Sequence, residues 1–328
     1  MTTLTMAKAL NEGLRKALDD DPKVIIMGED VGKLGGVFRI TDGLQKDFGE
    51  ARVFDTPLAE SGIIGTAVGL AIRGYRPVCE IQFDGFVFPG FDQIVNQVAK
   101  MHNRSAGKIR MPITIRIPFG GGIGAVEHHS ESPEAYFAHT AGLKVVSCSN
   151  PSDAYWMIQQ SIRSDDPVVF FEPKRRYWAK GELNDEPYPL HKARVVRPGR
   201  EATVAAYGPM VATALEAADA DGHDLEVIDL RSISPLDTAT VIESVERTGR
   251  LVVVHEASVS HGVGAELAAR VQERAFYSLE APVLRVGGFD TPYPASRLEE
   301  EWLPTVDRIL DAVDRVMDRP NSLSGVMD

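Results

Sequence analysis

Short apolar runs alternate with longer segments of helical periodicity along most of this chain. The runs 24–27 and 168–171 are typical of strands that are buried on both faces. The segments 61–73, 91–102 and 151–163 have helical spacing, and Asn150 is the expected N-cap of the third. A final helix is expected over about 302–317. Strands that alternate with helices predict an α/β fold with mainly parallel sheets, covered by helices on both faces.

The alternation stops between residues 172 and 200 and then restarts. This stretch is rich in Pro, Lys, Arg and Glu, but its aromatic residues Tyr177, Trp178 and Tyr188 argue against a flexible linker. A chain of 328 residues is long enough for about two domains. We therefore predict one domain over residues 1–185, which includes the crossing segment, and a second over residues 186–328.

Composition narrows the classes of function. The net charge of −12 argues against a general nucleic-acid or anionic-membrane binder. No apolar stretch approaches the roughly 20 residues that span a bilayer, and the first residues lack the basic flank and apolar core of a secretory signal. Cys79 and Cys148 each lie in an apolar run and are expected to be buried thiols. These features predict a cytoplasmic protein.

The segment 55–62 follows an expected strand and opens an expected helix. Ligands of open α/β sheets bind at the carboxyl ends of the strands, which makes Glu60 a candidate site residue. The helix dipole also favours an ionised carboxylate at this position. From position alone, Glu60 either serves a site or only complements the dipole.

Two histidines, His128 and His129, follow an expected strand and the glycine-rich loop 120–124. Glycine allows positive φ and lets the backbone approach a ligand closely. A histidine here is either an acid–base group or a solvated loop residue. The loop does not match the dinucleotide-binding fingerprint, because no third glycine stands at the required offset.

Four phenylalanines, Phe83, Phe86, Phe88 and Phe91, follow the expected strand at 77–81. Aromatic groups of this kind more often belong to a core. Three of the four lie in the irregular segment 82–90, where a ring can instead stack on a ligand.

Several of these segments, taken in order and spacing, resemble the β subunit of the E1 component of 2-oxoacid dehydrogenase complexes. The resemblance covers essentially the whole chain. Three segments look most like the branched-chain members, with pyruvate dehydrogenase as the near neighbour: 129–135, 171–174 and 289–292. The segments that carry the general resemblance are 27–31, Asp55-Thr56-Pro57-Leu58-Ala59-Glu60, 74–80, 91–94, 129–130, 142–146, 227–231 and 235–237.

The resemblance implies a transketolase-like pyrimidine-binding domain followed by a transketolase C-terminal-like domain. It implies thiamine diphosphate as cofactor, bound where this chain meets an α subunit in an α₂β₂ heterotetramer. The chain lacks the Gly-Asp-Gly motif and downstream asparagine that hold Mg²⁺ and the diphosphate in such enzymes. The α subunit is therefore expected to supply those ligands. The lipoyl acyltransferase core, E2, is the second expected partner and docks on the β C-terminal domains.

Site residues follow from the same resemblance. Glu60 matches the carboxylate that hydrogen-bonds N1′ of the cofactor's aminopyrimidine, and Phe86 matches the ring that stacks on it. Leu58 and Gln82 match neighbouring pocket positions. His129 matches the histidine that assists acyl transfer to the lipoyl group, although the adjacent His128 leaves a shift of one residue open. The backbone carbonyls expected to hold a structural K⁺ are those of Ile113, Ser161, Ile162, Ser164 and Asp166.

The predicted function is the decarboxylation of branched-chain 2-oxoacids with reductive acylation of the E2 lipoyl group. Pyruvate or acetoin chemistry on the same scaffold is the alternative within the class. A non-catalytic subunit that bridges the α chain and the core, and a stand-alone ligand-binding protein, are alternatives from other classes.

Overall fold

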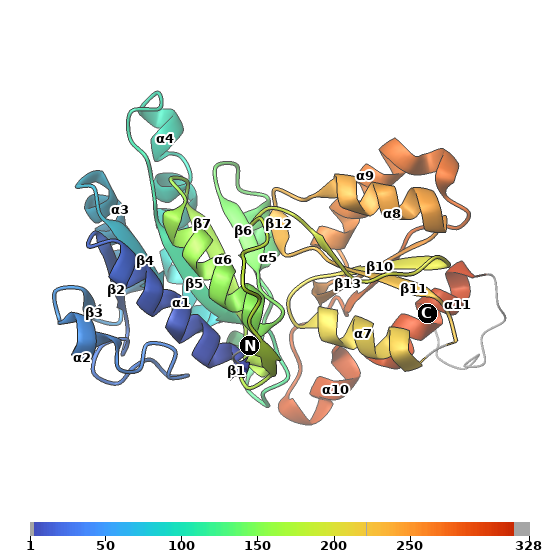
Figure 1. Cartoon of the computed structure of the whole chain (residues 1–328), viewed down its shortest axis with the longest axis horizontal. Helices are drawn as coiled ribbons and strands as arrows, with labels where there is room; N and C mark the ends of the chain where they lie inside the picture. Colours follow the sequence, from blue (N-terminus) through green and yellow to red (C-terminus); the bar gives the residue numbers. More distant parts are fainter. Residues whose placement is uncertain (1–2, 221, 318–328) are drawn as a thin grey trace.

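Two sheets, one in each half of the chain, organise the molecule (Figure 1). The computed structural model describes residues 3–220 and 222–317. Both sheets are mainly parallel, their strands are largely buried, and helices cover both faces of each. The predicted α/β fold with two mainly parallel sheets is therefore confirmed.

The first sheet has seven strands in the order β12-β6-β7-β5-β4-β2-β3. All neighbours are parallel except β12, which pairs with β6 in the antiparallel direction. A separate two-stranded ribbon joins β1 (Thr3–Thr5) to β8 (Lys180–Glu182). The strands of the large sheet are β2 (Val24–Gly28), β3 (Val53–Asp55), β4 (Arg76–Glu80), β5 (Thr114–Phe119), β6 (Lys144–Ser147), β7 (Val168–Pro173) and β12 (Ser232–Ser234).

Helices of the first domain confirm most of the predicted segments. α1 (Met6–Asp20) packs against α6 (Pro151–Arg163), whose N-cap Asn150 accepts a hydrogen bond from the Asp153 amide, as predicted. α3 (Glu60–Ile72) packs beside β4. Short elements complete the domain: α2 (Leu44–Phe48), α4 (Met101–Arg104), α5 (Glu134–Ala138) and the 3-10 turns η3 (Glu127–His129) and η4 (Lys174–Arg176).

The predicted helix over residues 91–102 is present but irregular. It follows a 3-10 helix, η1 (Asp84–Gly90), and consists of a π-helical stretch, η2 (Gln93–Val98), a turn, and then α4. In the widened turn the Asn96 carbonyl accepts a hydrogen bond from the Arg104 guanidinium, 2.8 Å away, so a side chain replaces a backbone donor.

The second sheet has the order β14-β13-β10-β11-β9, with only β9 antiparallel. α8 and α9 cover one face, and α7 and α11 cover the other (Figure 1).

The predicted final helix over 302–317 is split because Pro304 disfavours helix at Leu303, which is extended. The elements are β9 (Arg194–Arg197), β10 (Ala202–Ala206), α7 (Met210–Ala220), β11 (Leu225–Asp229), α8 (Thr238–Thr248), β13 (Leu251–Ser258), α9 (Val263–Ala275), η5 (Phe276–Ser278), β14 (Leu284–Gly288), η6 (Ser296–Leu298), α10 (Glu299–Trp302) and α11 (Val306–Val316).

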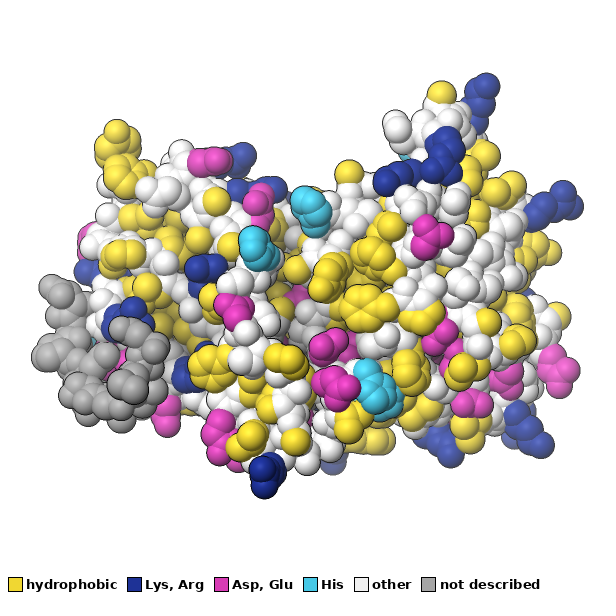
Figure 2. Space-filling view, turned by 180° about the vertical axis from the view of Figure 1, so that it is seen from behind, with side chains coloured by type: hydrophobic (Ala, Val, Ile, Leu, Met, Phe, Trp, Pro, Cys, Tyr) yellow, Lys and Arg dark blue, Asp and Glu magenta, His cyan; other side chains and the backbone are white. Residues whose placement is uncertain are grey.

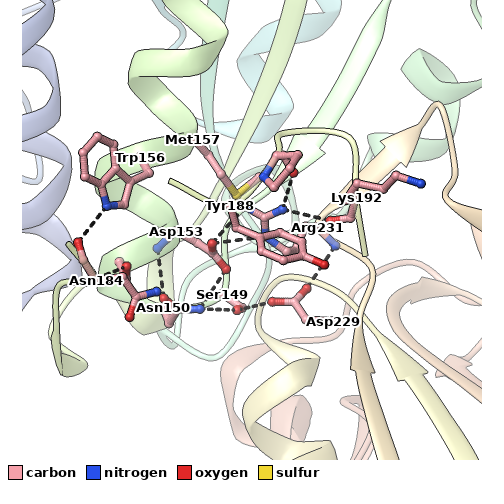
Figure 3. A network of polar contacts seen from close by, with 12 residues as sticks. Ser149, Asn150, Asp153, Trp156, Met157, Asn184, Tyr188, Lys192, Asp229 and Arg231 are labelled. Atoms are coloured by element: carbon pink, nitrogen blue, oxygen red, sulfur yellow. Dashed lines mark hydrogen bonds and ion pairs between the residues drawn. The ribbon is translucent and has the colours of Figure 1, made fainter. Parts of the chain in front are cut away.

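A buried polar network fastens the two domains together (Figure 3). Arg231, fully buried just after β11, lies 3.0 Å from the Asp153 carboxylate on α6 and donates to two backbone carbonyls of the crossing segment. The hydroxyl of Ser149 donates to Asp229 at 2.5 Å. Because each buried charge has partners from the other domain, the network favours one arrangement of the domains.

Two further predictions concern the cysteines and membrane-spanning segments. Cys79 and Cys148 are free thiols with no exposed surface, as predicted. Within residues 3–220 and 222–317, no helix is both long and apolar enough to cross a membrane.

Candidate active site

The predicted site residues come from loops at one edge of the first sheet. β3, β2, β4 and β5 are adjacent and parallel, so their carboxyl ends lie at the same edge. Glu29 follows β2, Glu60 follows β3, Phe86 follows β4 and His129 follows β5. The face turned away in Figure 1 carries hydrophobic, acidic and histidine side chains near the middle of the molecule (Figure 2).

Glu60 is the first residue of α3, as predicted, and its side chain is almost fully buried. In the described part of the chain its carboxylate has no hydrogen-bond donor. The η1 helix packs closely against the backbone of Glu60, because a Cβ added to Gly90 would lie only 3.3 Å from that backbone. A buried carboxylate without a donor is costly, so this one is suited to a donor brought by a ligand.

Glu29 lies close to Glu60 and is a site residue that sequence reasoning missed. Its Oε2 atom is buried and has no hydrogen-bond partner among the described residues. Burial, and then the nearby charges of Glu60, Asp30 and Glu80, raise the pKa of Glu29 to about 7. Such a carboxyl can hold or release a proton near neutral pH. The resembling segment 27–31 contains Glu29, which was the available signal.

Two further predicted residues, Gln82 and Leu58, follow strands at the same sheet edge as Glu29 and Glu60. The Gln82 amide donates to the Asp30 carboxylate at 2.9 Å, which fixes its orientation. Asp30 has a positive φ of 58°, an uncommon conformation for a residue other than glycine. Leu58, in the loop before α3, is 75% exposed. An exposed leucine two residues before the buried Glu60 suits an apolar contact with a ligand or partner.

The aromatic segment forms part of the site and not only of the core. Phe86 is half-buried, and its ring contacts Phe83 and His129 edge-on, with centroids 5.7 Å and 5.1 Å away. Phe88 remains 42% exposed and contacts Tyr136 on α5. Phe86 and Phe88 belong to η1, which packs against the helix α3 that Glu60 opens, and a partly exposed ring there is suited to stacking on an aromatic ligand.

His129 and His128 differ in their surroundings. His129 is half-buried and lies between phenylalanine rings, whereas His128 is half-exposed with Nδ1 3.5 Å from the Glu127 carboxylate. The Nδ1 atom of His129 lies 2.8 Å from the His128 carbonyl, which can only accept. Nδ1 therefore carries the hydrogen, and in the neutral ring Nε2 has the lone pair of a base.

A buried ion pair that the sequence did not indicate supports this region. Lys174, just after β7, pairs with Asp84 at the start of η1, and neither side chain is exposed. Asp84 also accepts a hydrogen bond from the Glu131 amide at 2.8 Å. Burial raises the pKa of Asp84 to about 6, although Lys174 and these hydrogen bonds oppose the shift. The pair therefore ties η1 to the end of the histidine segment.

The glycine-rich loop has the predicted positive φ values at Gly120, Gly122 and Gly124. Its close contact, however, is with the second domain of the same chain. A Cβ added to Gly121 would lie 1.8 Å from the Tyr293 hydroxyl oxygen. The glycine content of this loop is thus explained by the packing of the two domains.

The carbonyls predicted to hold K⁺ lie near the opposite edge of the sheet, around the starts of β4 and β7. The Arg76 guanidinium donates to the carbonyls of Ile162 and Ser164 at 3.2 Å and 3.0 Å. The carbonyls of Ile113 and Ser161 accept backbone amides, and the Asp166 carboxylate pairs with Lys144. No group of three or more His, Cys, Asp or Glu residues in the described ranges is arranged to hold a metal.

Comparison with known proteins identifies both halves of the chain. Residues 2–179 match the transketolase pyrimidine-binding domain family, and residues 191–309 match the transketolase C-terminal domain family. A split-gene transketolase in an inactive β4 tetramer superposes with a TM-score of 0.81 at 23% identity, covering 97% of this chain and 99% of that one. At that identity the superposition shows the shared fold.

Similar curated proteins are more informative. The chain is 64% identical over 318 residues to the pyruvate dehydrogenase E1 component subunit beta of Leifsonia xyli subsp. xyli, covering 95% of this chain and 94% of the relative. It is 56% identical over 325 residues to the 3-methyl-2-oxobutanoate dehydrogenase subunit beta of Mycobacterium tuberculosis, with 97% and 93% covered. It is 47% identical over 337 residues to the 2-oxoisovalerate dehydrogenase subunit beta of Pseudomonas aeruginosa, with 97% and 96% covered.

Proposed function

Because this chain belongs to the transketolase-like family of E1 β subunits of 2-oxoacid dehydrogenases, we propose that it decarboxylates branched-chain 2-oxoacids together with an α subunit. The observation that supports a catalytic role best is the meeting of Glu60, Phe86 and His129 at one sheet edge. A subunit that only bridged its partners would have no use for a buried, unpaired carboxylate there.

The family depends on thiamine diphosphate, and the residues present fit that cofactor. When protonated at N1′, its aminopyrimidine would offer the hydrogen-bond donor that the Glu60 carboxylate lacks. When bound, the cofactor supplies the electron sink for decarboxylation. We assign to Glu60 the task of holding and sharing the proton at N1′ of the aminopyrimidine. Glu29, whose pKa of about 7 allows it to hold a proton, lies beside Glu60.

Three residues are proposed to bind the same ring. The Phe86 ring is assigned to stack on the aminopyrimidine, and Gln82 and Leu58 to line its pocket. The large exposed fraction of Leu58 supports this, since cofactor or partner would cover it. His129 is assigned to face the reacting carbon and to assist acyl transfer to the lipoyl group, because its Nε2 is free to act as a base.

An α subunit is the proposed partner in a heterotetramer of two α and two β chains. The outer face of α3 supports such a contact, because Ser61, Gly62, Thr66 and Gly69 leave it exposed without a charged side chain. Small residues allow another helix to pack closely. The α subunit is proposed to hold Mg²⁺ and the diphosphate, and the C-terminal domain to receive the small binding domain of an E2 lipoyl acyltransferase.

Two finer assignments also remain proposals. We place the domain boundary at 185/186, between the two family matches. We also propose that the five carbonyls near β4 and β7 bind K⁺. A carbonyl oxygen has two lone pairs, so the carbonyls of Ile162 and Ser164 each keep one lone pair beside the hydrogen bond from Arg76. Thermal unfolding of the heterotetramer in KCl, compared with choline chloride of equal ionic strength, tests this; equal unfolding temperatures would count against it.

The substrate is the first point to test, because the relatives carry both branched-chain and pyruvate names. The segments 129–135, 171–174 and 289–292 support the branched-chain assignment. The experiment is to reconstitute the heterotetramer with the cognate α chain and to compare kcat/KM for 3-methyl-2-oxobutanoate and pyruvate. We expect the branched acid to be preferred. A preference for pyruvate would favour the alternative, and no activity with any 2-oxoacid would favour the bridging subunit.

A further inference from the structure

We propose that Glu299, on α10 of the C-terminal domain, is a positioning residue for the loop that carries His129. The inference rests on the proposed function, because it assigns Glu299 an effect on acyl transfer. It concerns a residue far along the chain from the cofactor pocket, which enters the reaction only through the loop it holds.

The histidine loop, residues 120–131, has little support of its own. It leaves β5 and closes on itself through a hydrogen bond from the Gly120 amide to the Glu131 carbonyl, 2.9 Å long. Its only regular structure is the short turn η3. Residues 122–124 and 126–128 are exposed. A segment with so few packed side chains takes its conformation from whatever holds its backbone.

Glu299 holds that backbone from the second domain. The carboxylate is nearly buried and accepts a hydrogen bond from the Gly122 amide at 2.8 Å and one from the Gly124 amide at 3.0 Å. Hydrogen bonds from backbone amides to an ionised carboxylate are among the stronger ones in proteins. Both glycines have φ near the left-handed region, +81° and +70°, which turns their amides towards the carboxylate at no steric cost.

Neighbouring residues fix the Glu299 carboxylate in place. The Tyr293 hydroxyl donates to it at 2.6 Å, and the Tyr293 ring packs edge-on against Trp302 with centroids 4.8 Å apart. A second carboxylate, Glu256 on β13, accepts a hydrogen bond from the Gly121 amide. Three backbone amides of the loop, those of Gly121, Gly122 and Gly124, thus donate hydrogen bonds to side chains of the C-terminal domain.

The loop has a second anchor at its other end. The buried Asp84 accepts the Glu131 amide, while its partner Lys174 lies 5.7 Å from the centre of the Phe83 ring. His129, which stacks on Phe83, lies between the two anchors along the chain. Removing Glu299 takes away the acceptor of two of the three loop amides and leaves the hydrogen bond from Gly121 to Glu256. The loop should then be less ordered and His129 should stack less on Phe83, while Glu60 stays in place.

The experiment compares Glu299→Ala with wild type in the reconstituted heterotetramer, with Glu300→Ala as matched control. Glu300 is the next residue of α10 and is exposed. Three quantities are measured: decarboxylation with an artificial electron acceptor, acylation of the free E2 lipoyl domain, and cleavage after Glu127 by a glutamyl endopeptidase. For Glu299→Ala we expect acylation to fall about tenfold and decarboxylation by less than about threefold. Cleavage should be faster, and the control should match wild type.

Wild-type acylation and cleavage rates in Glu299→Ala would overturn the proposal, as would equal losses in acylation and decarboxylation in an intact assembly. Glu299→Gln keeps one amide oxygen as acceptor and should recover part of the acylation rate. If Glu299→Ala does not assemble, Tyr293→Phe decides: it keeps the ring, removes the hydroxyl that donates to Glu299 and accepts the Gly122 amide at 3.3 Å, and should raise loop cleavage. No change there would also overturn the proposal. The cleavage assay does not require turnover of a substrate. If the substrate assignment is wrong, cleavage of Glu299→Ala is still faster than that of wild type; if the loop assignment is wrong, the two cleavage rates are equal.

Discussion

The imidazole of His129 is stacked on the ring of Phe83, with ring centroids 4.0 Å apart and planes only 19° from parallel. Phe83 in turn contacts Phe38 and Phe86 edge-on. The imidazole is therefore oriented by a ring that other rings hold, and its Nδ1 is occupied by the His128 carbonyl. Only Nε2 is left to meet a substrate.

Replacing His129 should separate two steps of the reaction. For His129→Ala in the heterotetramer we expect acylation of the lipoyl domain to fall about a hundredfold. Thiamine diphosphate affinity should change little, because Glu60 and Phe86 remain. His128→Ala is the matched control, since that ring is more exposed and should lose much less activity. Equal losses in acylation and cofactor binding, or a larger effect of His128→Ala, would argue against the role of His129.

The Asp84–Lys174 pair should contribute strongly to stability. Lys174→Met leaves the Asp84 carboxylate buried without its cation, which should lower the free energy of unfolding by about 3–5 kcal/mol. The double variant Asp84→Asn/Lys174→Met, which has no buried charge, should be more stable than Lys174→Met alone. Lys180→Met, at an exposed position, is the control. Urea unfolding gives the free energy of unfolding of all three variants. A loss of stability in Lys174→Met that is smaller than the loss in Lys180→Met would refute a stabilising pair.

Stability should fall as the pH rises towards 8 because of Glu134. Burial raises the pKa of this carboxyl from 4.5 to about 8, despite the hydrogen bond from the Tyr207 hydroxyl. The folded chain then binds more protons than the unfolded chain, so the free energy of unfolding declines between pH 4.5 and 8. Glu134→Gln, which has no charge to bury, should flatten this decline, whereas the exposed control Glu182→Gln should not. Parallel pH profiles for Glu134→Gln and wild type would contradict the assignment.

Local sequence signals were sufficient for several elements of the first domain, including the helix that begins at Glu60. The apolar strand runs, the Asn150 N-cap and the start of α3 at Glu60 depend on short-range periodicity and capping, which a sequence records directly. The glycine-rich loop was also located correctly, and the positive φ values at Gly120, Gly122 and Gly124 agree with it.

Contacts between distant segments were beyond such signals. Asp84 and Lys174 are 90 residues apart and Gly122 and Glu299 are 177 apart, so no periodicity links them. The edge strand β12 of the first sheet comes from residues 232–234, beyond the expected boundary, because the chain crosses back to pair with β6. In the π-helical stretch η2 the Asn96 carbonyl accepts a hydrogen bond from the Arg104 side chain, a contact that no periodicity of the sequence indicates.

The most direct test of the account is the decarboxylation rate of Glu60→Gln in the heterotetramer reconstituted with the cognate α chain. The amide cannot share a proton with N1′, so we predict a loss of about a hundredfold or more with the assembly intact by light scattering. Glu50→Gln, at an exposed position before β3, should keep the wild-type rate. A Glu60→Gln rate equal to that of wild type, in a fully assembled heterotetramer, would contradict the central claim.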